Sequence, residues 1–437
     1  MLGKYSPELF VRNFEKRMRK PVDRFEEVTV DKLVHGGQGL GTLSDGRKVF
    51  LWNALPGERV NAQITKAKKD FCEGVATEII VSSKDRITPK ESIFLATSPW
   101  QILNFKSENT YKSQILEDAF TREGIELDSV AMISDDRDFG YRNKIEFSFF
   151  GDDDGIHYAF FNRGTHQKQI VDGSALALPC LNSAGAEMLA SLNKLGVRAG
   201  DLKTLILRCD QNGRVAAALF VKTKSFEKLP TLHSISGIKV YYSNPKSPAS
   251  VATKLLYSIG ESILTDELNG IDISYDVTGF FQVNVPVFAK TLARIAEETS
   301  SFEHKVDMYA GVGSIGIPIG ETEALIELDP SNTALAKRNV GKLPIKVVQS
   351  SSEDSLEYIR DDSCLIVDPP RSGLHKDVIE RILEVKPRLI CYLSCNPSTQ
   401  ARDVGYLKDE YSLSLVEGYN FFPRTPHIEC LCILERK

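Results

Sequence analysis

Three short motifs in the C-terminal part of the sequence contain residues suited to binding a nucleotide-like ligand and to covalent chemistry. In the first, Gly311, Gly313 and Gly316 follow an apolar strand predicted for 306–309 and precede a predicted helix. Such glycines let a ligand approach the backbone at a helix N-terminus. Glu327, which ends the next predicted strand, could accept the hydroxyl pair of a ribose. The pattern predicts a nucleotide-containing cofactor; a nicotinamide cofactor and a merely glycine-rich turn are the alternatives.

The second motif is a stiff elbow at the end of another apolar strand. Asp368, Pro369 and Pro370 come directly after the predicted strand 364–367. Two prolines restrict the backbone, so we expect the carboxylate to point into the cleft at the end of the strand. The elbow resembles the Asp/Asn-Pro-Pro segment with which amino-group methyltransferases hold a base. Methylation of a base amino group is therefore one candidate chemistry.

The third motif places a cysteine at the end of a further apolar strand. Cys395 lies in Ser394-Cys395-Asn396-Pro397, followed by Arg402. A cation and exposed backbone N–H groups nearby favour the thiolate, which is the nucleophilic form. An isolated cysteine would be interpreted as inert, but the three motifs together favour a catalytic Cys395. Cys391, on the same strand, is predicted to lie in the core.

The elements around these motifs alternate between strands and helices. From about Val277, apolar strands are predicted at 306–309, 324–328, 345–348, 364–367, 389–393 and 429–434, with helices at 331–340 and 376–383. This alternation is typical of a doubly wound, mostly parallel α/β sheet, which binds ligands at the carboxyl ends of its strands. All three motifs follow such strands.

Two further regions precede the α/β region. Four short β-branched and aromatic runs within 28–81, separated by glycine-rich turns, predict a small antiparallel barrel. Its turns and strand ends carry Lys48, Arg59, Lys66, Lys68 and Lys69. The following region combines a helix at 107–124 with five strands and is predicted to be α+β. Within it, the segment 141–144 (Tyr-Arg-Asn-Lys) could contact phosphate and stack a base, or be an exposed strand end.

We therefore divide the chain into four segments. Residues 1–24 form a basic tail, which is either a solvated helix or an arm that contacts RNA. Residues 25–83 form the barrel, residues 84–275 the central α+β region, and residues 276–437 the catalytic α/β domain.

Composition excludes several classes of protein. The 437 residues carry a net charge of −5, and 42% of them are hydrophobic, which is ordinary for a globular protein. No apolar run reaches the ~20 residues that span a bilayer. The eight cysteines contain no C-x-x-C pair, so zinc ribbons and thioredoxin-like chemistry have no support. We expect a cytoplasmic monomer without membrane contact, in which local basic patches bind any polyanion.

Five strings in this sequence together resemble the bacterial RNA 5-methyluridine methyltransferases, which use S-adenosylmethionine (SAM) and a catalytic cysteine. They occur in the family's order: Phe280-Phe281-Gln282-Val283-Asn284, Asp307-Met308-Tyr309-Ala310-Gly311-Val312-Gly313, Asp368-Pro369-Pro370-Arg371, Ser394-Cys395-Asn396-Pro397 and Pro426-His427-Ile428-Glu429. Residues 28–82 are similar to the RNA-binding TRAM barrel of the ribosomal-RNA members. The resemblance implies a Rossmann-like, SAM-dependent methyltransferase domain that acts on RNA.

The resemblance also implies roles for individual residues. It gives Cys395 as nucleophile and Glu429 as general base. The residues that match the SAM-contacting positions are Gln282, Tyr309, Gly311, Gly313, Glu327 and Asp368. Ser314 stands where many relatives carry Asn. Ribosomal RNA is favoured over transfer RNA as the substrate, because the transfer-RNA members generally lack the barrel.

One departure from the family concerns iron. Many relatives hold an iron–sulfur cluster on four cysteines between the barrel and the following helix. Here that stretch reads Ala96-Thr97-Ser98-Pro99-Trp100-Gln101, and Cys72 is the only cysteine before Cys180. One thiolate cannot ligate a cluster. We expect a member without a cluster and without a metal site, in which Cys430 and Cys432 serve packing.

The chemistry explains why both Cys395 and Glu429 are needed. Uracil C5 is a poor nucleophile until a thiolate adds to C6, and a base must later remove the C5 proton. His427 is the rival base, two residues before Glu429. Phe421, Phe422 or Arg424 could line the space of the extruded base. An RNA-binding assembly factor without turnover is the alternative from a different functional class.

Overall fold

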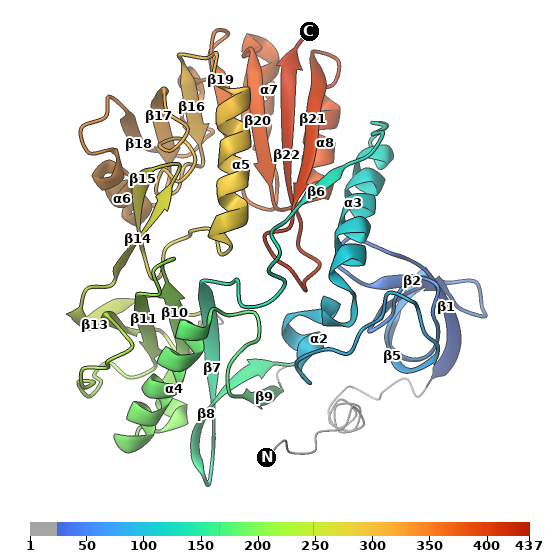
Figure 1. The fold of residues 1–437 in the computed structure, drawn as a ribbon, viewed down its shortest axis with the longest axis vertical. Coiled ribbons are helices and arrows are strands. Elements are labelled where there is room, and N and C mark those ends of the chain that lie inside the picture. The colour runs from blue at the N-terminus through green and yellow to red at the C-terminus, as the bar shows by residue number, and fades with distance from the viewer. Residues whose placement is uncertain (1–23, 166, 248) are drawn as a thin grey trace. The chain divides into compact units, whose positions relative to one another are not determined.

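The computed structural model describes residues 24–165, 167–247 and 249–437 (Figure 1). The predicted basic tail therefore lies outside the described residues, apart from Arg24. By the density of contacts the chain divides into two compact units. The first contains the described residues up to Ile115 together with Phe161–Gln167 and Pro423–His427, and the second contains the rest. No helix of the described residues is long and apolar enough to cross a bilayer.

Residues 25–81 form the predicted barrel. Its strands are β1 (Phe25–Leu33), β2 (Gly39–Thr42), β3 (Lys48–Trp52), β4 (Arg59–Ala67) and β5 (Phe71–Val81). They follow the order β1-β2-β3-β5-β4, and antiparallel pairing of β4 with β1 closes the barrel. The β3–β5 pair is parallel, whereas the sequence predicted an antiparallel barrel. Inward residues such as Val28, Val49, Leu51 and Val60 are at most 1% exposed and form the barrel core.

The first unit continues beyond the barrel into three helical segments. These are α2 (Phe94–Thr97), the 3-10 turn η1 (Pro99–Ile102) and the first part of α3 (Phe105–Arg122). The predicted helix at 107–124 therefore exists and begins two residues earlier. Trp100 is 1% exposed, and its Nε1 donates to the Gly37 carbonyl at 2.9 Å, which fixes η1 against the barrel turn.

The second unit contains the central sheet. In the described residues its strand order is β13-β12-β11-β10-β7-β8-β9. The strands are β7 (Lys144–Asp152), β8 (Gly155–Phe161), β9 (Lys168–Val171), β10 (Leu202–Cys209), β11 (Val215–Val221), β12 (Gly237–Tyr242) and β13 (Lys254–Gly260), with helix α4 (Pro179–Lys194) and turn η2 (Ala199–Asp201). Five of these strands match the predicted ones. The hairpin β14 (Ile263–Leu268) and β15 (Ile271–Asp276) follows.

The α/β sheet in the same unit has the order β18-β17-β16-β19-β20-β22-β21-β6. Its strands are β16 (Lys305–Met308), β17 (Thr322–Glu327), β18 (Lys346–Gln349), β19 (Cys364–Val367), β20 (Leu389–Ser394), β21 (Tyr411–Tyr419), β22 (Glu429–Arg436) and β6 (Ala131–Ile133). The first five in spatial order run parallel, and β22 runs antiparallel to β20. The predicted fold class is confirmed.

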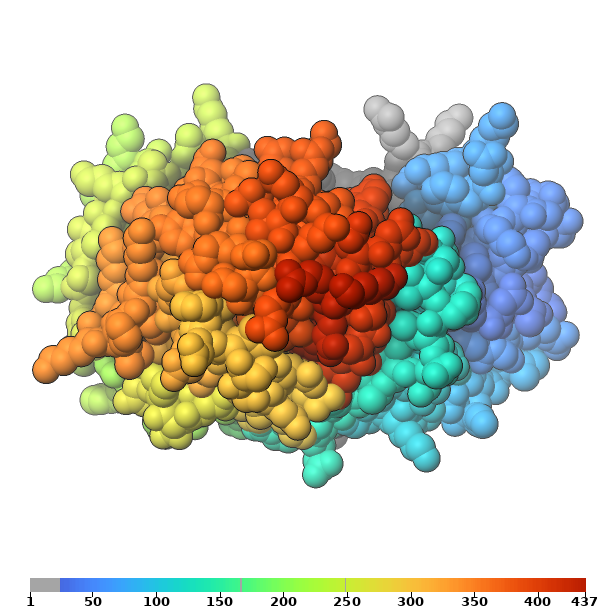
Figure 2. Space-filling view, turned by 90° about the horizontal axis from the view of Figure 1, so that it is seen from above, coloured from blue at the N-terminus to red at the C-terminus, as the bar shows by residue number. Residues whose placement is uncertain are grey.

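Helices cover both faces of this sheet. Helix α5 (Val285–Glu298) lies on one face, and α7 (Lys376–Val385) and α8 (Pro397–Leu407) lie on the other (Figure 1). Helix α6 (Pro330–Val340) follows β17, and the turn η3 (Leu356–Tyr358) follows β18. In the space-filling view the gold residues around α5 and the orange and red residues of the sheet form one continuous surface (Figure 2). Beneath this surface, apolar side chains of the sheet and of α5, among them Phe288, Leu325 and Ile366, belong to one buried core cluster.

The structure differs from the prediction after the glycine-rich motif. Residues 311–320 form successive turns instead of a regular helix. Only the Ile317 and Ile319 N–H groups in this stretch make helical bonds to carbonyls four residues back, at 3.1 and 3.4 Å. Pro318 lacks an N–H group, which interrupts helical bonding. The expected helix N-terminus at Gly316 is therefore absent.

Candidate active site

The predicted site residues converge at one edge of the α/β sheet. Met308 is in register with both Ile326 and Val367, and Val367 with Tyr392. Because the strands run parallel, the residues that follow them lie at the same carboxyl edge. Tyr309, Glu327, Asp368 and Cys395 all occupy such positions. The sequence motifs, up to 86 residues apart (395 − 309) in the chain, are thus brought together by strand order.

Glu327 connects the glycine-rich loop to the start of α6, with one carboxylate oxygen for each. One oxygen accepts the Gly311 N–H at 2.9 Å, and the other accepts the Asp329 N–H at 2.7 Å. Each carboxylate oxygen keeps a second lone pair for a ligand hydroxyl. Tyr309 has a φ of 67°, in the left-handed region where a non-glycine side chain is strained. Such strain is typical of functional loops.

The glycines of this loop differ in their surroundings. A Cβ added to Gly311 would meet no atom within 4 Å, so its backbone faces open space. A Cβ added to Gly313 would lie 2.5 Å from the Ile317 side chain, and Gly313 has a φ of 84°. Gly313 is therefore required for packing, whereas Gly311 leaves room for a ligand.

A second acid, Asp307, lies directly beneath the loop. It is fully buried, and its Oδ2 accepts the Gly316 N–H at 2.8 Å. Burial raises its pKa to about 8, against the lowering effect of this bond. Its Oδ1 has no hydrogen-bond partner among the described residues. Sequence analysis did not single out Asp307 as a titrating group.

The Asp-Pro-Pro elbow is fixed by helix α8. The Arg371 carbonyl accepts the Asn396 Nδ2 at 2.8 Å and the Thr399 hydroxyl at 3.2 Å. The Ser372 carbonyl accepts the Arg402 Nη2 at 2.9 Å. Burial raises the pKa of Asp368 to about 7, so this carboxyl resists ionisation.

Buried Asp403 completes this anchoring. Its Oδ2 accepts the Leu374 N–H and the Tyr392 hydroxyl, each at 2.8 Å, and its Oδ1 pairs with Arg402 at 2.7 Å. A Cβ on Gly373 would lie 2.4 Å from the same Oδ2. The carboxylate thus reaches the turn because residue 373 has no side chain.

Cys395 and Glu429 face each other across two strands. The antiparallel register of β20 and β22 pairs Leu389 with Glu435 and Ser394 with Cys430. Cys395 directly follows β20 and Glu429 opens β22, one position beyond the Ser394–Cys430 pair on each strand, and the charge of Glu429 acts on the Cys395 thiol. Cys395 is partly buried and Glu429 is 4% exposed.

The electrostatics of this pair are set by burial and by three neighbours. Burial raises the pKa of Cys395 to about 11, and the charges of Glu429 and Asp368 add to the rise. Arg371 opposes it through its charge and a hydrogen bond to the thiol. Burial also raises the pKa of Glu429 well above its usual value, with Asp368 adding and Arg371 opposing. Arg371 is therefore the cation that favours both charged forms.

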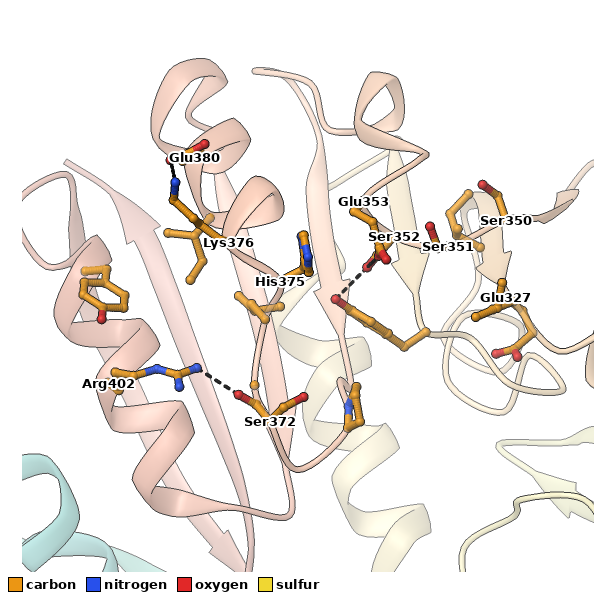
Figure 3. Close-up of a pocket in the computed structure, with 18 of the residues that line it drawn as sticks. Glu327, Ser350, Ser351, Ser352, Glu353, Ser372, His375, Lys376, Glu380 and Arg402 are labelled. Atoms are coloured by element: carbon orange, nitrogen blue, oxygen red, sulfur yellow. Dashed lines mark hydrogen bonds and ion pairs between the residues drawn. The ribbon is translucent and has the colours of Figure 1, made fainter.

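A pocket of about 980 Å³ lies at the carboxyl ends of β17, β18 and β19, next to Tyr309 (Figure 3). Tyr309 and Glu327, which are expected to contact SAM, line it together with the exposed apolar Leu328. The structure adds lining residues that sequence analysis missed: Ser350, Ser351, Ser352, Glu353, Leu374 and His375. The Ser352 hydroxyl donates to the Tyr309 hydroxyl at 2.8 Å. The polar run 350–355 after β18 was the signal that could have indicated this wall.

Not every predicted residue lines this pocket. Gln282, Gly311, Gly313, Asp368, Cys395 and Glu429 are not among its lining residues. Gln282 is 4% exposed, and its carbonyl accepts the Asn143 Nδ2 at 3.1 Å. Asn284 is fully buried, and its side-chain amide has no hydrogen-bond partner among the described residues. An unpaired buried amide is costly, which indicates a function for this segment.

The structure also shows the surroundings of residues that were considered for contact with the RNA base. Phe421 is fully buried with its ring centroid 6.0 Å from that of Phe288, so it belongs to the core. Arg424 belongs to the first unit, where Glu108 accepts its N–H at 3.0 Å. Tyr141 is 1% exposed, which leaves no ring surface for stacking a base.

The structure also locates the cysteines outside the proposed site. Cys391 is buried in the core, as predicted, and the Sγ atoms of Cys430 and Cys432 lie 3.9 Å apart inside the sheet. Across residues 24–165, 167–247 and 249–437, no three His, Cys, Asp or Glu side chains are arranged to hold a metal ion. The absence of an iron–sulfur cluster stays a prediction.

Comparisons with known proteins find related RNA methyltransferases. The family model described as tRNA (Uracil-5-)-methyltransferase matches residues 355–437, and the TRAM domain model matches 22–77. An uncharacterized RNA methyltransferase of Thermotoga maritima is 29% identical over 431 residues, covering 92% of this chain and 97% of that protein. One from Fusobacterium nucleatum is 28% identical, covering 94% and 96%.

A solved structure shares the fold over most of the chain. The tRNA (uracil-54, C5)-methyltransferase of Pyrococcus abyssi, in complex with S-adenosyl-L-homocysteine, superposes with a TM-score of 0.77 at 23% identity. The match covers 94% of this chain and all of that one.

Proposed function

Because this chain belongs to the RNA (uracil-5-)-methyltransferase family, we propose that it transfers the methyl group of SAM to C5 of a uridine in structured RNA. The observation that carries the proposal is the Cys395–Glu429 pair, a thiol opposite a buried carboxyl beside Arg371. Methylation of an exocyclic amino group or hydride transfer would need no such thiol.

Each residue of the pair has one role. The Cys395 thiolate adds to C6 of an extruded uracil, which makes C5 nucleophilic. C5 then bonds to the donated methyl group and carries both this methyl and its original proton. Glu429 takes that proton as the electrons of the C5–H bond re-form the C5–C6 double bond and the thiolate leaves. Arg371 stabilises the thiolate before addition and after release.

SAM supplies an activated methyl group when bound, and the residues at the sheet edge fit it. The pocket volume of about 980 Å³ lies within the range of ligand sites, and apolar Leu328 is 65% exposed in its wall. We assign the ribose to Glu327 and the methionine part to the loop at Gly311 and Gly313, where the Gly311 backbone is open and Gly313 packs the loop against Ile317. Tyr309, Asp368 and Gln282 complete the proposed set. The Pyrococcus relative holds S-adenosyl-L-homocysteine, the demethylated form of SAM.

For the RNA we favour 23S ribosomal RNA, because the barrel accompanies the ribosomal-RNA members. We assign RNA binding to the barrel (25–83) and the central region (84–275), and catalysis to 276–437, in a cytoplasmic monomer without an iron–sulfur cluster. Transfer RNA is the second candidate, since the Pyrococcus relative, which matches nearly the whole chain, acts on tRNA. Comparing 5-methyluridine in both RNAs from a deletion strain and its parent decides between them.

Mutation separates the two chemical steps. Cys395→Ala should abolish both methylation and covalent attachment to RNA. Glu429→Gln keeps the shape of the side chain but cannot accept the proton, so a methylated adduct should accumulate that survives denaturing electrophoresis and requires SAM. His427→Ala serves as the control and should turn over. If the His427→Ala variant accumulates the adduct and the Glu429→Gln variant turns over normally, His427 is the proton acceptor and Glu429 is not. Wild-type levels of 5-methyluridine in a strain that carries only Cys395→Ala would show that the modification does not depend on this thiol, and would favour the assembly-factor alternative instead.

A further inference from the structure

The outer face of the barrel carries an aromatic pair. Along β3, Val49 and Leu51 point inward and are fully buried, so Lys48 and Phe50 point outward. Phe71, the first residue of β5, is in register with Lys48 on the adjacent strand. The Phe50 and Phe71 ring centroids lie 5.6 Å apart at an interplanar angle of 89°, and both residues remain partly exposed.

Cations border this pair. The Lys68 Nζ lies 4.6 Å from the Phe71 ring centroid, and its carbonyl accepts the Arg47 Nη1 at 3.0 Å. Two chain segments, 45–48 and 66–73, therefore lie next to each other. Each consists of a turn with the adjoining strand ends, and together they contain five cations and three carboxylates. Arg47 pairs with Asp45 and Lys66 with Glu73. Within the described part of the chain, Lys48, Lys68 and Lys69 form no ion pair.

These features suit single-stranded nucleic acid better than a structural role. An aromatic ring on the outside of a closed barrel cannot reach the barrel core, yet here two lie together. Proteins that bind single strands combine aromatic side chains, on which bases stack, with cations that follow the backbone. The contact between a lysine and an exposed aromatic ring contributes little stabilisation. A base can therefore take the place of the ammonium group on the ring, while that group moves to a phosphate. A duplex keeps its bases stacked internally and would use the lysines alone.

We propose that the Phe50–Phe71 surface, made of Phe50, Phe71, Lys48, Lys68 and Lys69, binds a single-stranded segment of the RNA substrate. Bases stack on the two rings, and phosphates lie against the three lysines. The inference rests on the proposed function only in taking RNA as the substrate. It assigns to the barrel a preference for unpaired RNA, which the net charge of the protein does not suggest.

The test measures binding of the full-length protein to a fluorescent oligouridine of about 12 nucleotides and to a duplex RNA of similar length. The double variant Phe50→Leu/Phe71→Leu stays apolar and should weaken binding to the single strand by about 5- to 100-fold, with little change for the duplex. Phe71→Tyr keeps the ring and should bind like the wild type. Phe25→Leu removes a 49% exposed phenylalanine from β1 of the same barrel and is the matched control.

Salt dependence tests the lysines separately. Lys68→Gln/Lys69→Gln should reduce the slope of log affinity against log salt by about 0.7 for each lost phosphate contact. The Leu double variant should leave that slope unchanged, because stacking releases no counterions. Equal losses for the Leu double variant and Phe25→Leu, or equal losses on single strand and duplex, would overturn the proposal, as would an unchanged slope in the Gln variant. Methylation is measured independently, so a wild type that stacks RNA without methylating it refutes the proposed function alone.

Discussion

The Cys395 thiol has a cation and two carboxyls as its charged neighbours, so replacing them should change its reactivity in opposite directions. With a pKa of about 11, roughly one thiol in a thousand is ionised at pH 8. Arg371→Met removes the cation that stabilises the thiolate. An opposite charge at hydrogen-bond distance shifts a pKa by about 1–3 units, and the exposure of Arg371 places the effect near the lower limit. We expect alkylation of Cys395 to slow about tenfold at every pH well below the thiol pKa of about 11.

Glu429→Gln should act in the other direction, and only at high pH. Burial raises the pKa of Glu429, so below that pKa the residue is neutral and resembles glutamine. As the pH rises through the raised pKa, the wild-type carboxylate ionises and disfavours the neighbouring thiolate, whereas glutamine does not. The ratio of variant to wild-type alkylation rates should therefore be near 1 at low pH and increase toward about tenfold.

Iodoacetamide is a suitable reagent because it is uncharged and reacts with thiolates. Alkylation is followed by mass spectrometry of the Cys395 peptide, since the chain has eight cysteines. The partly exposed Cys180, quantified in the same digest, is the internal reference. If both variants change the rate in the same direction, or if the Glu429→Gln ratio is independent of pH, the electrostatic account of the pair is wrong.

Further predictions concern the cofactor, the elbow and iron. Glu327→Ala and Asp368→Ala should each lower SAM affinity about tenfold or more while RNA affinity is retained. Glu327 holds the Gly311 loop, and Asp368 follows β19 at the same edge of the sheet. If titration calorimetry finds an unchanged SAM affinity in both variants, the assignment is refuted. Tyr392→Phe removes one buried hydrogen bond to Asp403 and should lower the free energy of unfolding by about 1.5–3 kcal/mol in urea titrations. Protein purified anaerobically should contain no stoichiometric iron or sulfide; finding both would mean that the cysteine spacing misled us.

Much of the site was predictable because its residues follow strands with a clear pattern. The runs before Tyr309, Asp368 and Cys395 are short, apolar and separated by helices, and this alternation fixes which end of each strand bears the ligand site. Strand β6 was not predictable, because three residues carry no periodic signal. The turns at 311–320 also escaped prediction, since glycine-rich loops of similar sequence open regular helices in other proteins.

The residues that line the pocket could not be predicted from the sequence, for a different reason. His375 and Ser352 reach it from loops after two different strands, and neither lies in a motif with a known spacing. The anchoring of the elbow by Asp403 is also invisible in the sequence. It depends on Gly373 and Tyr392 meeting one carboxylate, and only the folded chain brings those residues together.

The choice between Glu429 and His427 illustrates how the fold decides chemistry. An alternating pattern would place both residues on one face of a strand, but β22 begins only at Glu429. His427 is exposed and belongs to the first compact unit, whereas Glu429 is 4% exposed in the second. Burial raises the proton affinity of a carboxylate, and the base that removes the C5 proton needs that affinity. Glu429 lies in the same unit as Cys395, and its charge acts on that thiol.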